Sequence, residues 1–263
     1  MRATLLLNLI ATSIDPALAV GRCVLQMEKV RSGERKKEYP MRKWLNRFVR
    51  PFGLKVIKAH HEDMVYQHHY DGGYDEYRAT QIYHNKRKLE NVWADDVTLS
   101  AVAADIRAHG LGATGVCHGA RNGYEVEWFR NMLGGEIIGT DISDTATQFP
   151  NMHVWDFQDV NPDWAEKFDF VYTNSLDQAM DPQRTLDSWT QQLTPEGRIY
   201  IEHTMAHSPS GAGEMDPFGA HPMVMPYLFF IWGRDAYNLV DILEIDEKQN
   251  NRKKAWVFVL TRA

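Results

Sequence analysis

Two short segments in the middle of the chain constrain its fold most strongly. Residues 116–123 read Val-Cys-His-Gly-Ala-Arg-Asn-Gly, and residues 139–142 read Gly-Thr-Asp-Ile. In the first, an apolar run ends in a turn where Gly119 and Gly123 let backbone N–H groups approach a ligand closely. Asp141 follows Gly119 by 22 residues, which suits a carboxylate that accepts hydrogen bonds from ribose hydroxyls. The two segments therefore predict a nucleotide-type cofactor site at the carboxyl edge of a parallel sheet.

The usual dinucleotide-binding pattern is absent from this turn. A Gly-x-Gly-x-x-Gly run that starts at Gly119 needs glycines where Arg121 and Tyr124 stand. Residues 110–115 match the pattern formally but precede the apolar strand, so Gly110 is better explained as a left-handed cap after a helix at 99–109. A nucleotide- or NAD-binding oxidoreductase on the same sheet is the alternative interpretation, and the missing glycines argue against it.

The segments after residue 116 alternate between strand and helix patterns. We expect strands at 136–142, 152–157, 168–175 and 198–203, a helix that starts at Asp181-Pro182 and ends near residue 193, and a terminal hairpin from 237–243 and 256–261. This alternation predicts an α/β protein with a doubly wound, mostly parallel sheet. We expect a helical N-terminal extension at 1–73 and the cofactor-binding domain at 74–263.

The order of these motifs resembles that of the class I S-adenosylmethionine-dependent methyltransferases over roughly residues 95–263. The resemblance rests on the first motif at 117–123, Asp141 after the second strand, Asp156-Phe157 after the third, and Phe-Asp-x-Val-x-x-Asn at 168–174. A Leu-x-Pro-x-Gly turn follows at 193–197. The segment Gly-Thr-Asp-Ile-Ser-Asp-Thr-Ala-Thr-Gln-Phe-Pro at 139–150 is similar to a subgroup that carries a Cys-His-Gly-x-Arg-x-Gly first motif.

The resemblance implies a seven-stranded Rossmann-like methyltransferase sheet with S-adenosyl-L-methionine as cofactor. The cofactor-binding residues that it implies are His118, Gly119, Arg121, Gly123, Asp141, Ile142, Asp156, Phe157, Asn174 and Ser175. Two residues depart from the family pattern, because Cys117 replaces an acidic residue and Arg121 replaces a glycine. Arg121 is expected either to pair with the cofactor carboxylate or to hold a neighbouring loop. The departures leave a non-enzymatic, partner-binding protein as a third interpretation, against which Asp141 and Asp156 argue.

Methyl transfer from a sulfonium requires alignment of the acceptor and, for an oxygen or nitrogen acceptor, a base. We expect the catalytic residues among His203, His207 and Asp177, which follow the fifth and fourth strands. The acceptor is expected to be a small molecule with a hydroxyl, such as a sugar-derived one, or less readily an amine. The loop at 208–226 is expected to act as a lid, with an apolar pocket lining from Met205, Met215, Met223, Met225, Phe218 and Tyr227.

A helix is expected within residues 74–93, before the first strand. Either Tyr77, Gln81 and Asn85 share one of its faces at steps of four, or Tyr74, Gln81 and Lys88 share one at steps of seven. By analogy with the family, this helix covers the cofactor, and Gln81, Asn85 and Lys86 reach the cofactor or substrate. An exposed polar face is the equal alternative.

The net charge of −6 is unevenly distributed. Residues 29–58 hold eleven Lys or Arg against Glu34 and Glu38, a balance of +9, so the rest of the chain carries −15. An acidic body argues against a nucleic-acid substrate. Residues 41–50 pattern as a basic amphipathic helix, which favours packing on the domain over weak docking on a membrane surface or an anionic glycan.

The remaining features favour a soluble cytoplasmic protein. Residues 1–19 resemble a signal peptide, but Asn8, Asp15 and Pro16 interrupt the apolar run, so we expect an N-terminal helix. The two cysteines suggest a reducing compartment. The histidines show no metal-site spacing, so no metal is expected.

Overall fold

The computed structural model describes residues 64–249, 251 and 253–263. The basic segment at 29–58 and the expected N-terminal helix lie outside the described residues, so both stay predictions.

A seven-stranded sheet organises the described part of the chain. Its strands are β2 (Gly115–His118), β3 (Ile137–Asp141), β4 (Met152–Val154), β5 (Phe168–Thr173), β6 (Leu193–Thr204), β8 (Tyr237–Ile245) and β9 (Ala255–Arg262). They lie in the order β4-β3-β2-β5-β6-β9-β8. Neighbours from β4 to β6 run parallel, and β9 is antiparallel to both β6 and β8. The predicted mostly parallel sheet is confirmed, and the strand order reverses direction at β2, where such sheets bind ligands.

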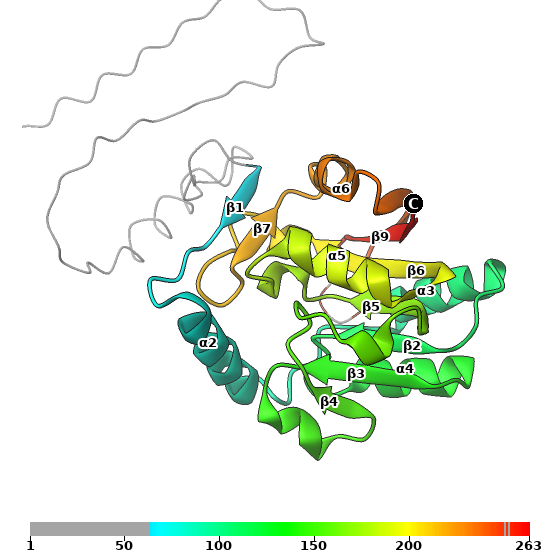
Figure 1. The fold of residues 1–263 in the computed structure, drawn as a ribbon, viewed down its shortest axis with the longest axis horizontal. Helices are drawn as coiled ribbons and strands as arrows, with labels where there is room; N and C mark the ends of the chain where they lie inside the picture. Colours follow the sequence, from blue (N-terminus) through cyan, green and yellow to red (C-terminus); the bar gives the residue numbers. More distant parts are fainter. Residues whose placement is uncertain (1–63, 250, 252) are drawn as a thin grey trace, which may run out of the picture. The chain divides into compact units, whose positions relative to one another are not determined.

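Helices cover both faces of the sheet (Figure 1). On one face, α3 (Asp96–Ala108) and α4 (Tyr124–Leu133) contribute Leu99, Val102 and Phe129 to a buried cluster. On the other face, α5 (Pro182–Gln192) and α6 (Met225–Gly233) contribute Leu186, Trp189 and Phe229 to a second one. The sheet is therefore doubly wound, as the alternating pattern predicted.

Local sequence signals explain where two of the helices begin and where one of them ends. The Asp95 side chain accepts a hydrogen bond from Thr98 N and caps α3, and Asp181 accepts one from Arg184 N and caps α5. Gly110 follows the end of α3 with φ +62°, a left-handed conformation that favours glycine. The formal dinucleotide pattern at 110–115 is therefore a helix end, as expected.

Short segments complete the fold. Within the described residues, 3₁₀ helices cover Asp144–Gln148, Pro162–Trp164, Leu176–Gln178 and Met205–His207. Strand β4 ends at Val154, before the predicted end at 157, and the chain turns at Asp156, whose side chain accepts from Gln158 N.

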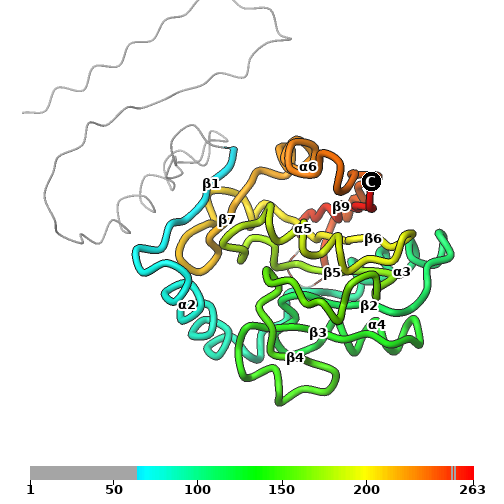
Figure 2. The backbone as a smooth tube through the Cα atoms, viewed as in Figure 1, coloured from blue at the N-terminus to red at the C-terminus, as the bar shows by residue number. Residues whose placement is uncertain are grey.

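A small second sheet joins two distant parts of the chain. Strand β1 (Val65–Gln67) pairs antiparallel with β7 (Phe218–Ala220), and the two lie side by side in Figure 2. The helix α2 (Gly73–Arg87) follows β1 and lies across the end of the sheet toward which the β3 arrow points in Figure 1. Residues 65–67 thus pair with the body, while the domain boundary at 73/74 stays a prediction.

Candidate cofactor and acceptor site

The turn after β2 has a backbone that admits little besides glycine at its first position. Gly119 has φ +70°, and a Cβ there would lie 2.6 Å from the Ser175 Cβ. Arg121 adopts φ +44°, a left-handed conformation that is strained for a side chain with a Cβ. The turn therefore packs directly against Ser175 at the end of β5, which a residue with a Cβ at position 119 would prevent.

A cavity of about 510 Å³, counted with its open mouth, lies over this turn. Its walls come from the ends of β2, β3 and β4 and from one face of α2. Six of the ten predicted cofactor residues line it: Gly119, Arg121, Asp141, Ile142, Asp156 and Phe157. The α2 face adds Tyr77, Gln81, His84, Asn85 and Lys88, with Gln178 and Met215 beyond.

Two carboxylates in this cavity have distinct surroundings. Asp141 is 6% exposed and accepts a hydrogen bond from Ser143 N at 2.9 Å. Burial raises the pKa of Asp141 to about 6, so donors from a ligand would favour its ionised form. Asp156 accepts from the Tyr74 hydroxyl at 2.8 Å.

Helix α2 is held over the cavity by polar side chains. The Tyr77 hydroxyl donates to Gln178 O at 3.1 Å, Gln81 Nε2 donates to Met215 O at 3.0 Å, and Asn85 Oδ1 accepts from Thr145 Oγ1 at 2.8 Å. Gln81 and Asn85 thus line the cavity, as one of the two alternatives expected. Lys86 does not, because it points outward and pairs with Asp144 at 2.8 Å.

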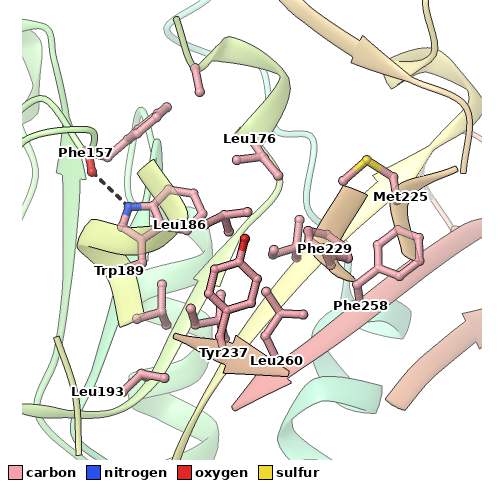
Figure 3. Close-up of a cluster of buried hydrophobic side chains, with 14 of the residues drawn as sticks. Phe157, Leu176, Leu186, Trp189, Leu193, Met225, Phe229, Tyr237, Phe258 and Leu260 are labelled. Atoms are coloured by element: carbon pink, nitrogen blue, oxygen red, sulfur yellow. Dashed lines mark hydrogen bonds between the residues drawn. The ribbon is translucent and has the colours of Figure 1, made fainter. Parts of the chain in front are cut away.

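The aromatic side of the cavity is anchored in the core. Trp189 Nε1 donates to Phe157 O at 2.9 Å, the contact drawn as a dashed line in Figure 3. Phe157 belongs to the same buried cluster as Trp189 and is 6% exposed. The core on the α5 face therefore fixes where Phe157 meets the cavity.

A second cavity, of about 1120 Å³ with its open mouth, adjoins the first. Lys88, Arg121 and Gln178 line both cavities and so mark their junction. The second cavity is also lined by Glu90, Asn91, Val92, Trp93, Asn174, Ser175, Asp177, Ala206, His207 and Asp216. The predicted residues Asn174, Ser175, Asp177 and His207 thus come together at the carboxyl ends of β5 and β6.

The lining of the second cavity is polar, which corrects the expected apolar pocket. Met223 and Tyr227 are 74% and 62% exposed, while Phe218 and Met225 are buried in the core. Met215 lines the first cavity instead. The loop at 208–226 reaches the site through Met215 and Asp216, because its β7 strand is tied to β1.

The two predicted catalytic histidines have different positions. His207 lines the second cavity, accepts from Thr204 N at Nδ1 (3.3 Å), and places Nε2 3.9 Å from Asp177 Oδ2. His203 lines neither cavity, because it is 2% exposed and bonds Ala220 O through Nε2 at 2.9 Å. Burial lowers the pKa of both imidazoles to about 3, so both are neutral. A catalytic role for His203 does not fit this placement.

Asp177 is the carboxyl group of the second cavity with the strongest burial. It is 8% exposed, and burial raises its pKa to about 7. The imidazole of His207 is neutral, and its Nε2 lies 3.9 Å from Asp177 Oδ2, which is too far for a hydrogen bond. Asp177 therefore exchanges a proton near neutral pH, which a general base requires.

Two of the predicted cofactor residues lie away from both cavities. His118 is fully buried, stacks on Trp189 with ring centroids 5.1 Å apart, and bonds Thr140 and Gln192 at 2.9 Å each. Burial lowers its pKa to about 4. Gly123 is the N-cap residue that precedes α4, with φ +74°. These placements give both residues structural roles in forming the turn.

Sequence reasoning missed several lining residues, among them Trp93 and Asp216. Helical periodicity groups Lys88 with Tyr74 and Gln81 on the alternative face of the helix, and Lys88 lines both cavities. Trp93 and Asp216 come from irregular segments far apart in the chain, for which no sequence signal existed. Trp93 is held by a bond from its Nε1 to Glu202 at 3.0 Å and by a bond from Lys248 Nζ to its carbonyl at 2.8 Å.

The described residues set two further limits. No three of their His, Cys, Asp or Glu side chains are grouped to hold a metal ion. No helix within the same residues has the length and apolar character to cross a membrane.

Comparison with solved structures identifies the fold. The chain resembles the 1,6-didemethyltoxoflavin-N1-methyltransferase of Burkholderia thailandensis, solved with 1,6-didemethyltoxoflavin and S-adenosylhomocysteine, with a TM-score of 0.55 and 16% identity over 72% of this chain and 90% of that one. It also resembles the [4+2]-cyclase SpnF, with a TM-score of 0.54 and 11% identity over 71% of this chain and 96% of that one. The chain matches no family model and no curated protein sequence.

These similarities show a Rossmann-like fold of the class I methyltransferase type. The two neighbours are named for different reactions, a methyl transfer and a cyclisation. The reaction of this chain must therefore be argued from its own site.

Proposed function

We propose that the chain binds S-adenosyl-L-methionine in the first cavity and transfers its methyl group to a small molecule in the second. The observation that carries this proposal is the meeting of Gly119, Asp141 and Asp156 around one cavity at the sheet's switch point. The bound S-adenosylhomocysteine of the Burkholderia methyltransferase supports the same cofactor class.

The residues of the first cavity fit this cofactor. Glycine at 119 lets the turn lie against Ser175, where a Cβ would clash, and leaves the backbone of the turn exposed to the cavity. Asp141 ends β3 and would accept hydrogen bonds from the ribose hydroxyls, while Asp156 and Phe157 follow β4 and would contact the adenine. Arg121 lines the junction of the cavities, where it can pair with the cofactor's carboxylate.

The cofactor supplies an activated methyl group, so the protein's task is to align the acceptor and remove its proton. Asp177 is the proposed base, because it lines the acceptor cavity and burial raises its pKa to about 7. His207 is not the base, because its Nδ1 accepts from Thr204 N, so the ring proton sits on Nε2 and no lone pair is free for a substrate proton. A hydroxyl acceptor, sugar-derived or otherwise, suits the polar lining, and an amine is the second choice.

Calorimetry with S-adenosylhomocysteine tests the cofactor assignment. We expect saturable one-to-one binding, and no binding of NADH under the same conditions, which separates the proposal from the oxidoreductase alternative. NADH binding without S-adenosylhomocysteine binding would reject the proposal.

Incubation with methyl-labelled S-adenosylmethionine and a fractionated small-molecule extract tests the reaction. Label should pass to an organic-soluble or polar small molecule, and Asp177→Asn should abolish the transfer. Cofactor binding with no transfer to any fraction would favour the non-enzymatic interpretation.

A further inference from the structure

Lys88 lies at the junction of the two cavities, and its ammonium group has a weak hydrogen-bond acceptor. Lys88 follows α2, lines both cavities and is half-buried. Among the described residues it forms no ion pair, and its side chain donates to the Met215 sulfur at 2.6 Å. A thioether sulfur is a weak acceptor for an ammonium group. Burial accordingly lowers the pKa of Lys88.

The carboxylate of Asp216 lines the second cavity and also lacks a side-chain partner among the described residues. Asp216 lines the second cavity and is half-buried, and within the described part of the chain no side chain hydrogen-bonds its carboxylate. Burial raises the pKa of Asp216 to about 7, Asp177 adds to the rise, and Lys88 opposes it. Lys88 and Asp216 thus line the same cavity with opposite charges.

Lys88 and Asp216 nevertheless do not join as an ion pair within the described residues, whereas exposed pairs such as Lys86 and Asp144 do. Two opposite charges that face one cavity and stay apart are complementary to a ligand that carries both charges. An α-amino acid group is such a ligand, with one carboxylate and one ammonium on adjacent carbons.

The cofactor's own amino-acid end would reach this place. With its adenine and ribose bound by Asp156 and Asp141 in the first cavity, the cofactor would extend its amino-acid end to the junction at Lys88 and Arg121. Cys117, where the family carries an acidic residue, is fully buried and cannot meet the ammonium. We propose that Lys88, beside Arg121, binds the α-carboxylate of the cofactor and that Asp216 binds its α-ammonium. This inference rests on the proposed function.

The test compares two ligands that differ at this end alone. S-adenosylhomocysteine carries the α-amino acid group, and 5′-methylthioadenosine keeps the adenosine and sulfur but lacks it. Calorimetry would measure both on the full chain and on Lys88→Met and Asp216→Asn. We expect each substitution to weaken S-adenosylhomocysteine by ~10-fold or more while 5′-methylthioadenosine changes by less than about twofold. Lys86→Met and Asp159→Asn are matched controls on exposed charges.

The outcomes separate this inference from the proposed function. Equal losses for both ligands would mean that the two residues act through the fold, and would overturn the inference. It would also be overturned if the unsubstituted chain bound S-adenosylhomocysteine no more tightly than 5′-methylthioadenosine, although the cofactor assignment would then stand. Binding of neither ligand by the unsubstituted chain would reject the proposed function itself.

Discussion

Asp177 Oδ2 lies 3.9 Å from Nε2 of His207, and the other ring nitrogen of that histidine accepts a hydrogen bond from Thr204 N. The acceptor role of Nδ1 places the proton of the neutral ring on Nε2. Nε2 therefore has no free lone pair for a substrate proton. The carboxylate is the group of this pair that can accept one.

The rate of methyl transfer should rise with pH through about 7. The base must be ionised, and burial raises the pKa of Asp177 to about 7. A histidine base would instead give a flat profile above pH 4, because burial lowers the pKa of His203 and His207 to about 3. The check is kcat/KM from pH 5 to 9. Asp177→Asn should lose ~10²–10⁴ in turnover with cofactor affinity intact.

Asp177→Asn should stabilise the ligand-free protein at pH 8. The pKa of Asp177 rises from 3.8 to about 7 on folding, so the folded state holds its proton more tightly than the unfolded state. Stability from this group is full below pH 3.8 and falls as pH rises to about 7. Denaturant unfolding should show a gain on the order of 2 kcal/mol at pH 8 and none near pH 4. A variant less stable than the unsubstituted protein at pH 8 would contradict this.

Asp141→Asn should weaken S-adenosylhomocysteine by ~10-fold, because each charge-assisted hydrogen bond to the ribose contributes about 1.5–3 kcal/mol. Calorimetry provides the measurement. Asp144→Asn is the control, since Asp144 is exposed and pairs with Lys86. Undiminished affinity in Asp141→Asn would remove Asp141 from the cofactor site.

Arg121→Gly should be more stable than Arg121→Ala by about 1 kcal/mol, because φ is +44° at this position. Both variants lose the bond from Nη1 to Asn91 O at 3.0 Å, so that loss cancels in the comparison. If Arg121 binds the cofactor carboxylate, the two variants should lose S-adenosylhomocysteine affinity equally. Equal stability would show that the backbone relaxes without strain.

Lys248→Met should destabilise the fold by about 3–5 kcal/mol, because it leaves the buried Glu202 without its cation. Lys248 and Glu202 are 0% and 1% exposed and form an ion pair. Adding Glu202→Gln should recover part of the loss, since no charge is then buried alone. Denaturant unfolding of Lys248→Met, Glu202→Gln and the double variant measures the coupling free energy between the two residues. Lys254→Met, at an exposed pair with Glu244, should show no comparable change.

The order of the strands and the residues of the first cavity that lie near strand ends could be predicted because their signals are local. Asp141 and Asp156 follow apolar runs, and Asp181 caps a helix that begins with proline. The parallel sheet then places such residues at one edge. The positions of Gly119 and Asp141 in one cavity follow from that rule, and the structure has them there.

The histidines show where local signals end. His118, His203 and His207 all follow or end strands, yet His207 alone reaches a cavity. The difference is made by Trp189, Gln192 and Ala220, which lie far from them in sequence. A residue's position at a strand end is encoded locally, but the burial of its side chain is not.

The sequence by itself determined the alternation of strands and helices, the glycine turn after β2 and the carboxylates at the end of β3 and after β4, because periodicity and turn chemistry act over a few residues. The tertiary structure decided that Lys88, Trp93 and Asp216 meet at a polar second cavity. It also decided that burial keeps His203 and His207 neutral and raises the pKa of Asp177 to about 7. Those outcomes depend on desolvation and on contacts between distant segments, and both arise only when the chain packs.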